Sequence, residues 1–211
     1  IDLAAQAPDA GERTRAGALA ALLTPVVKSF FTERGFQLAS DALQVFGGYG
    51  YVHEYRIEQI LRDSRIAMIY EGTNQIQALD LLQRKVLSGP DGLAPLLEVF
   101  AAEAALPSAH AASLQSWCDT LAQATHALAQ DAAQDAELPA RAAEDYLRLV
   151  GTVALAYTWC RAARVAQALD PAHPAHTQKR EGARYFFDYV LPGAAHWLRL
   201  VQAARHPVAP V

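Results

Sequence analysis

Cysteine, methionine and long apolar runs are all scarce in this chain of 211 residues. It contains two cysteines and one methionine, and two thiols in a chain of this size favour a reducing compartment over a disulfide scaffold. Every apolar run is broken by Thr, Arg, Asp or Pro before it reaches the roughly 20 residues that cross a bilayer. We therefore expect a cytoplasmic protein without a membrane span, in which Cys118 and Cys160 stay unpaired.

Charge of one sign is not gathered into blocks along the sequence. Lys and Arg number 18 and Asp and Glu number 22, which gives a formal net charge of -4, and the two kinds are interspersed. Nucleic-acid binding needs a basic patch or stripe, so nucleic acid is not an expected partner. The chain opens at Ile1 with no basic and hydrophobic leader, and we expect it to be a piece of a longer protein.

The residues that are abundant predict helices. Hydrophobic residues make up 52% of the sequence, many of them alanine, whereas runs of Val, Ile and Thr are few, so the predicted fold class is all-α. Helical spacing of apolar residues runs through 12–23, 25–46, 55–67, 73–87, 93–105, 109–133, 139–169 and 177–204. Thr24 followed by Pro25 predicts a helix start, and Pro192 predicts a kink inside the last helix.

A cluster of helix-ending residues divides the chain into two predicted domains. Ser88, Gly89 and Pro90 follow one another directly, and such residues punctuate regular structure. We predict a first helical bundle over 1–89 and a second over 90–211. In the second bundle Trp117, Trp159 and Trp197 fall one to a helix, which favours core packing over a ligand cage.

The chemically informative stretch is 44–77, which reads QVFGGYGYVHEYRIEQILRDSRIAMIYEGTNQIQ. Its glycines, Gly47, Gly48 and Gly50, could let a phosphate approach the backbone, although a helix C-cap and turn explains them better. The sequence from Thr73 to Gln75 places polar groups and free amides at a helix start, which suits either an anionic ligand or simple N-capping. Glu71, just before that helix, could be a functional carboxylate or merely favourable for the helix dipole.

Taken together, these segments resemble the C-terminal helical domain of the acyl-CoA dehydrogenase family. The motifs QVFGGYGY (44–51), RD (62–63) and YEGTNQIQ (70–77) occur in the family's order and spacing, and the resemblance is firm over about 14–87. The segments LTPVVK (23–28) and ALDLL (78–82) further resemble the 3-methylmercaptopropionyl-CoA dehydrogenase-like subgroup, which carries an extra C-terminal helical domain. The chain departs from the family at His53 and Arg56, where a basic residue and a proline are usual.

The resemblance implies a catalytic role for Glu71 as the base that removes the α-proton of an acyl-CoA thioester, while hydride leaves the β-carbon for N5 of FAD. It implies that Tyr70 and Gly72 contact the substrate. It further implies contacts to FAD from five residues: Gln44, Gly47, Gly48, Thr73 and Gln75. The first three would reach the cofactor of a neighbouring subunit.

The same resemblance implies an enzyme of fatty acid metabolism that assembles as a homo-oligomer, dimeric or tetrameric. Its partners would be an acyl-CoA substrate and an electron-transfer flavoprotein or similar acceptor. We expect FAD in the full-length enzyme but neither bound flavin nor activity in this fragment, because the regions that complete both pockets are missing from it.

Two other functions and one other site are open on the sequence. A homologue of the same fold could protect DNA, which would call for a basic face, or the chain could be only a helical oligomerisation module. His173 and His176 have a spacing compatible with a metal ion, yet they lie in a proline-rich connector without a third ligand nearby. No metal site is expected.

Overall fold

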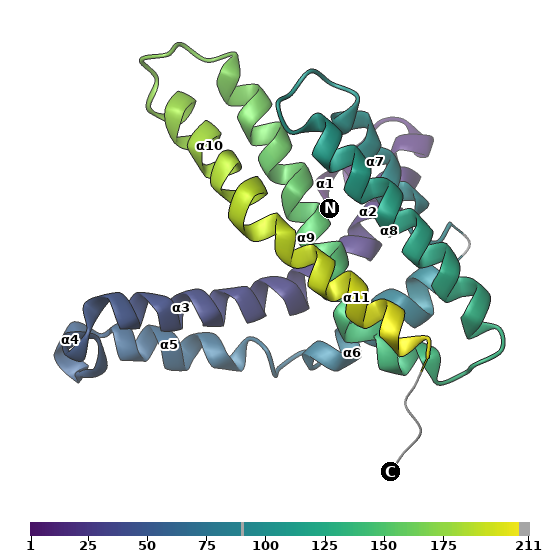
Figure 1. Cartoon of the computed structure of the whole chain (residues 1–211), viewed down its shortest axis with the longest axis horizontal. Helices are drawn as coiled ribbons and strands as arrows, with labels where there is room; N and C mark the ends of the chain where they lie inside the picture. Colours follow the sequence, from purple (N-terminus) through teal and green to yellow (C-terminus); the bar gives the residue numbers. More distant parts are fainter. Residues whose placement is uncertain (90, 207–211) are drawn as a thin grey trace.

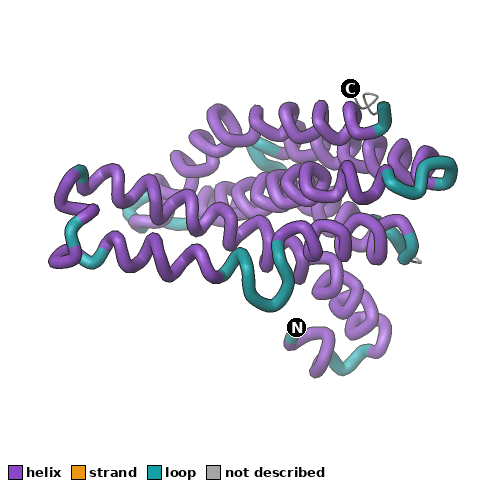
Figure 2. The backbone as a smooth tube through the Cα atoms, turned by 90° about the horizontal axis from the view of Figure 1, so that it is seen from below, coloured by secondary structure: helices purple, strands orange, loops and turns teal. Residues whose placement is uncertain are grey.

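The computed structural model describes residues 1–89 and 91–206, and every regular element within these two ranges is a helix (Figures 1 and 2). This confirms the predicted all-α fold class. The longest helix, α9 (Leu138–Gln167), lies at the centre of the bundle. Helices α6 (Asn74–Leu79), α8 (Ala111–Ala132), α10 (Pro174–Tyr185) and α11 (Ala194–Ala204) pack against it.

Helix α9 occupies the centre because it is apolar on more than one side. Tyr146, Val150 and Val153 are completely buried in it, and a helix without a continuous polar face is stable only when neighbours surround it. The hydroxyl of Tyr146 lies 2.8 Å from Oγ1 of Thr125 on α8, so the buried phenol keeps a hydrogen-bond partner. No helix of the described part of the chain is long and apolar enough to cross a membrane.

The tryptophans, the cysteines and Pro192 occupy distinct places in the bundle. Trp117, Trp159 and Trp197 all pack, partly buried, against the core, which confirms their structural interpretation. Cys118 and Cys160 are buried and free. The α-helical pattern is interrupted around Pro192 by π-helix η4 (Phe186–Val190) and 3₁₀ helix η5 (Leu191–Gly193), as its missing amide predicts.

The expected helix start at Thr24 is wrong. Helix α2 (Ala10–Val26) continues through Pro25 into π-helix η1 (Val27–Phe31) and then α3 (Thr32–Phe46). Proline at position 25 removes the amide that would bond to the carbonyl of Ala21. Lys85 supplies a substitute donor, with 2.6 Å between its Nζ and that carbonyl oxygen. A contact 64 residues away in sequence therefore allows the helix to continue.

Helices α3 and α5 (Ile57–Ile66) form an antiparallel arm that projects from the bundle (Figure 1). Helix α4 (Gly48–Tyr51) and 3₁₀ helix η2 (His53–Tyr55) connect them at the tip. Neither α3 nor α5 contains a buried residue. Exposed apolar side chains run along the arm, namely Leu38, Val45, Phe46, Tyr49, Tyr51, Val52, Tyr55, Ile60 and Ile66. An apolar surface of this extent is typical of an interface with another segment or subunit.

The segment after the arm returns to the bundle. Helix α6 continues as π-helix η3 (Asp80–Leu87) and leads to α7 (Ala94–Ala104); a short helix, α1 (Asp2–Gln6), precedes α2. Leu22 and Leu82, before the predicted domain boundary, share one core with Leu96 and Leu149 beyond it. Pro90 lies outside the described residues, and the division into 1–89 and 90–211 stays a prediction.

Candidate active site

Glu71 lies in the connector between α5 and α6, at the base of the arm (Figure 1). Its backbone has φ 55°, and that of Gly72 has φ 97°. A non-glycine residue with positive φ is uncommon and costs of the order of 1 kcal/mol, so the surrounding structure must hold it. The side chain of Glu71 is exposed in this chain.

Gln77 holds the backbone of this connector from the α6 side. Its Nε2 donates to the carbonyl oxygen of Glu71 over 3.2 Å. A Cβ atom placed on Gly72 would lie 2.9 Å from the same Nε2, so a side chain at position 72 would displace Gln77 as well as strain the backbone. Glycine at position 72 is therefore a requirement of the connector's geometry.

Lys28 holds the other end of the connector. Its Nζ donates to the carbonyl oxygen of Ala67 over 2.7 Å and lies 5.5 Å from the ring centroid of Tyr70, within cation–π range. Sequence reasoning did not identify this role, although Lys28 is the single charge in the apolar segment from Val26 to Phe31. A lone lysine among core residues indicates a nearby acceptor.

The start of α6 combines exposed and buried polar groups. Thr73 has extended backbone angles and is the N-cap residue, but its side chain makes no capping hydrogen bond. Thr73 and Gln75 are exposed. Asn74 between them is buried, and its Oδ1 has no hydrogen-bond donor among the described residues. Since buried acceptors are rarely left without a partner, a donor from a ligand or partner segment would fit here.

The glycine-rich turn lies at the opposite end of the arm. Gly47, with φ 59°, ends α3, and its amide donates to the carbonyl of Gln44 over 3.0 Å. A Cβ on Gly50 would lie 2.6 Å from the carbonyl oxygen of Leu43, which requires glycine there. These contacts favour the helix-ending interpretation of the glycines. Gln44, Gly47 and Gly48 nevertheless remain exposed at the tip.

The structure thus separates the predicted site residues into two groups. Tyr70, Glu71, Gly72, Thr73 and Gln75 lie together at the base of the arm, whereas Gln44, Gly47 and Gly48 lie at its tip (Figure 1). Helix α3, with 15 residues, separates them by about 22 Å at 1.5 Å per residue. The two groups therefore form two different surfaces of one chain.

Two residues that depart from the family pattern lie near the tip. Arg56 has φ 60°, a conformation closed to proline, whose ring holds φ near -65°. The connector therefore takes a path that the usual proline would prevent. His53 lies 3.0 Å from Glu58, and Nε of Arg62 donates to the same carboxylate over 2.7 Å. Arg62 and then His53 lower the pKa of Glu58 through these hydrogen bonds.

His173, one of the two histidines considered for metal binding, has a local structural role. Nδ1 of His173 accepts a hydrogen bond from the amide of Ala175 over 3.2 Å and so caps α10. Across 1–89 and 91–206, no group of three His, Cys, Asp or Glu side chains is arranged to hold a metal ion.

Comparison with known proteins identifies both halves of the chain. A family model described as "Acyl-CoA dehydrogenase, C-terminal domain" matches residues 3–86, and a model described as "Acetyl-CoA dehydrogenase C-terminal like" matches 93–210. The chain is 36% identical over 176 residues to 3-methylmercaptopropionyl-CoA dehydrogenase of Ruegeria pomeroyi, a match that covers 80% of the chain and 30% of that relative.

Shorter matches cover the first half of the chain. An acyl-CoA dehydrogenase of Bacillus subtilis is 42% identical over 64 residues, which are 30% of the chain and 17% of the relative. A broad-specificity linear acyl-CoA dehydrogenase of Mycobacterium tuberculosis is 42% identical over 66 residues, 31% of the chain and 11% of the relative. The chain therefore spans less than a third of the length of each of these relatives.

Proposed function

The chain belongs to the acyl-CoA dehydrogenase family, and from this we propose that it is the C-terminal helical part of an FAD-dependent acyl-CoA dehydrogenase. The proposed reaction is the α,β-dehydrogenation of an acyl-CoA thioester. The observation that carries the proposal is a carboxylate, Glu71, on a connector that Lys28 and Gln77 hold at both ends.

We propose that Glu71 removes the α-proton of the substrate. That proton is only weakly acidic, so the base must be positioned against it in a pocket from which water is excluded. Glu71 is exposed in this chain, but Ile69, Tyr70 and Ile76 around it expose 47%, 51% and 58% of their surface. These apolar side chains favour coverage of the site by the remainder of the full-length enzyme.

We propose that Tyr70 and Gly72 contact the substrate on either side of the base. Tyr70 is exposed and close to the ammonium of Lys28, which orients its ring. Gly72 would contribute backbone groups, and no side chain, to this contact.

Polar and glycine residues at the two ends of the arm could contact a flavin. Thr73 and Gln75 are exposed at the base, and Oδ1 of Asn74 between them has no hydrogen-bond donor in the described part of the chain. We propose that Thr73 and Gln75 hold FAD there. Bound FAD would accept the β-hydrogen as hydride. Gln44, Gly47 and Gly48, at the tip, would contact the FAD of a neighbouring subunit.

The arm supports the proposal of a homo-oligomer, dimeric or tetrameric. Its exposed apolar side chains would be covered when neighbouring subunits pack together.

The electron acceptor would be an electron-transfer flavoprotein or a similar protein. Two free thiols, Cys118 and Cys160, support a cytoplasmic location, and we propose two domains, 1–89 and 90–211.

The proposal is tested by Glu71→Gln in the full-length protein. The amide cannot accept the α-proton, so kcat should fall by about 10²-fold to 10⁴-fold, with FAD absorbance and acyl-CoA binding nearly unchanged. Flavin bleaching across a panel of acyl-CoA substrates measures turnover. Glu98→Gln is the matched control, because Glu98 is an exposed glutamate on α7 and its loss should leave kcat unchanged. Normal turnover by Glu71→Gln would remove this residue from the mechanism.

A second function, a helical oligomerisation module without catalysis, is favoured by the same exposed arm. It predicts that the full-length protein assembles but binds no FAD and bleaches with no acyl-CoA. The enzymatic proposal predicts FAD in the full-length protein and none held stoichiometrically by 1–211 alone, because this chain supplies only part of each proposed pocket.

A further inference from the structure

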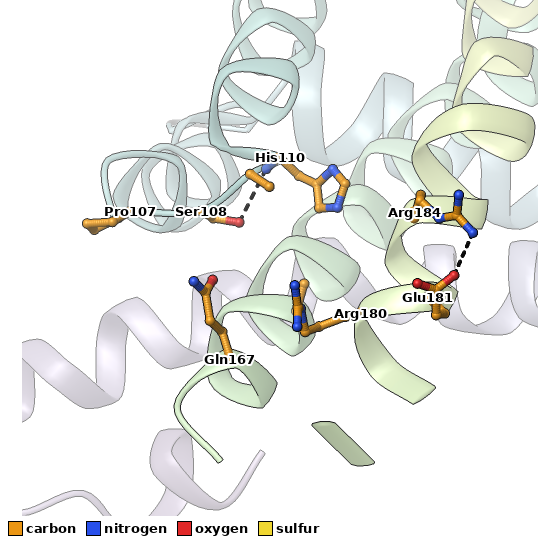
Figure 3. Close-up of a pocket in the computed structure, with 9 residues that line it drawn as sticks. Pro107, Ser108, His110, Gln167, Arg180, Glu181 and Arg184 are labelled. Carbon is orange, nitrogen blue, oxygen red and sulfur yellow. Dashed lines mark hydrogen bonds and ion pairs between the residues drawn. The ribbon is translucent and has the colours of Figure 1, made fainter. Parts of the chain in front are cut away.

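A pocket of about 440 Å³ lies in the second half of the chain, and Glu71 is not among its lining residues (Figure 3). Its polar lining comes from the α7–α8 connector, the end of α9 and the middle of α10, and consists of Ser108, His110, Gln167, Arg180, Glu181 and Arg184. The volume falls within the roughly 300–1,000 Å³ typical of small-molecule sites. No part of the proposed dehydrogenase mechanism uses it.

Several hydrogen-bond donors line this pocket and have no acceptor among the described residues. Arg180 and the amide of Gln167 make no hydrogen bond or ion pair with the described residues, and both extend toward the hollow (Figure 3). Oγ of Ser108 accepts from the amide of His110 over 3.3 Å and from the thiol of Cys160 over 3.5 Å. Because both contacts use its oxygen as acceptor, the hydroxyl proton of Ser108 is free to donate.

The ring of His110 is held in place at the pocket's edge. It stacks on Phe187 with 4.1 Å between ring centroids and 5° between planes. Burial lowers the pKa of this ring, while the charge of Asp188 acts in the opposite direction. An uncharged imidazole offers one N–H donor and one acceptor to a ligand.

Local charge around the pocket is opposite to that of the whole chain. Residues 157–188 contain five Arg or Lys and three Asp or Glu, a net charge of +2 in a chain of net charge -4. One of the three acids, Asp188, is close enough for its charge to act on His110 and Arg184. Three of the five cations are engaged: Arg161 with the Tyr157 hydroxyl, Arg164 with Glu103, and Arg184 with Glu181. Among the described residues, Arg180 is the pocket-lining cation without a hydrogen-bond or ion-pair partner. The unpaired positive charge is therefore localised at the pocket and does not form a broad basic face.

We propose that this pocket binds a small molecule carrying a phosphate group, with Arg180 as the principal contact. A guanidinium can donate two parallel hydrogen bonds to phosphate oxygens. The other donors, from Ser108, Gln167 and His110, come from separate segments and match an anion that presents several oxygens in different directions. Glu181 neutralises Arg184 and is positioned to accept from a hydroxyl on the organic part of the ligand.

The test uses the full-length protein and compares two charge-removing variants on the same helix. Arg180→Gln removes the cation that lines the pocket, whereas Lys179→Gln removes its neighbour, whose Nζ lies over the Trp159 ring at 5.9 Å. The probes are inorganic phosphate, glucose 6-phosphate and acetate, titrated by calorimetry at constant ionic strength. Both positions are exposed, so both variants should fold, and matching unfolding temperatures check this.

We expect both phosphate probes to bind and acetate to bind at least tenfold more weakly. Arg180→Gln should raise the Kd for phosphate at least tenfold, the loss expected for a charged hydrogen-bonding group, and Lys179→Gln should change it less than twofold. Tighter binding of glucose 6-phosphate than of phosphate would identify an ester as the ligand; equal affinities would identify free phosphate.

Three results would overturn the proposal: no phosphate binding below about 10 mM, an equal loss from both variants, or equal affinity for acetate. Retention of duplex DNA weakened equally by both variants would likewise indicate diffuse attraction instead of a pocket. None of these outcomes depends on the role of Glu71, because basal dehydrogenation should be the same in Arg180→Gln as in the unmodified protein.

Discussion

The ammonium group of Lys28 donates a hydrogen bond to the backbone carbonyl of Ala67, with 2.7 Å between the two atoms. This contact joins η1, inside the bundle, to the connector that carries Glu71. Gln77 holds the other side of that connector through the carbonyl of Glu71. The proposed catalytic base is thus positioned by two side chains that act on backbone oxygens rather than on its carboxylate.

Replacing Lys28 by methionine should therefore impair catalysis without removing the base. Lys28→Met keeps the aliphatic chain but leaves the carbonyl of Ala67 without its donor and Tyr70 without its cation. We expect kcat of the full-length enzyme to fall by about 10-fold to 10²-fold, because displacements of about 1 Å at a reacting group have effects of this size. Steady-state kinetics and FAD absorbance are the measurements.

Lys85→Met is the matched control for this change. Lys85 also donates to a backbone carbonyl, that of Ala21 over 2.6 Å, and pairs with Asp80 over 2.7 Å. Its loss should lower the free energy of unfolding by about 1–3 kcal/mol and leave kcat unchanged. Equal kinetic effects from the two variants would mean that Lys28 contributes only to general stability.

Gly151 on α9 should tolerate no larger residue. A Cβ placed there would lie 2.6 Å from Cγ of Phe30 on η1, and both residues are buried. Gly151→Ala should reduce the free energy of unfolding by about 1–3 kcal/mol through overpacking, despite the gain of about 1 kcal/mol in helix propensity. Urea denaturation of 1–211, followed by tryptophan fluorescence, measures the change.

Gly17→Ala provides the comparison within α2. Nothing lies within 4 Å of a Cβ at Gly17, so only the gain in helix propensity remains, and stability should rise by up to about 1 kcal/mol. Stabilisation by both alanine variants would contradict the close packing of η1 against α9.

Cys118 should be unreactive in the folded chain. Burial, then the charges of Asp119 and Cys160, raises the pKa of the Cys118 thiol to about 11. At pH 8 only about one thiol in 10³ would be ionised, and the thiolate is the reactive form. Alkylation by iodoacetamide, located by peptide mass mapping, should label Cys118 only after unfolding.

The same shift has a consequence for stability at high pH. The folded pKa lies above that of the unfolded thiol, so the unfolded state loses its proton first as the pH rises. The contribution of Cys118 to stability is complete below about pH 9 and is lost progressively toward pH 11. A chain with Cys118→Ala should show a smaller decline in the free energy of unfolding across this interval; an identical decline would exclude the thiol as its cause.

Sequence reasoning predicted the helices well where local patterns determine them. The predicted segments 93–105 and 109–133 correspond to α7 and α8, whose bounds differ by two residues or fewer. It failed at Thr24, because the local signal for a helix start was strong and the compensating donor, Lys85, lies far away in sequence. It also gave Lys28 no role, since the acceptor Ala67 is 39 residues distant.

By itself, the sequence determined the helical class and the set of chemically capable residues around Glu71, because both depend on residue type and short-range spacing. Only the tertiary structure decided which of those residues meet. It placed Gln44 and Glu71 at opposite ends of an arm, and it gathered Ser108, Gln167 and Arg180 around one pocket. Such contacts depend on how helices pack against α9, and packing depends on the shapes of many side chains at once.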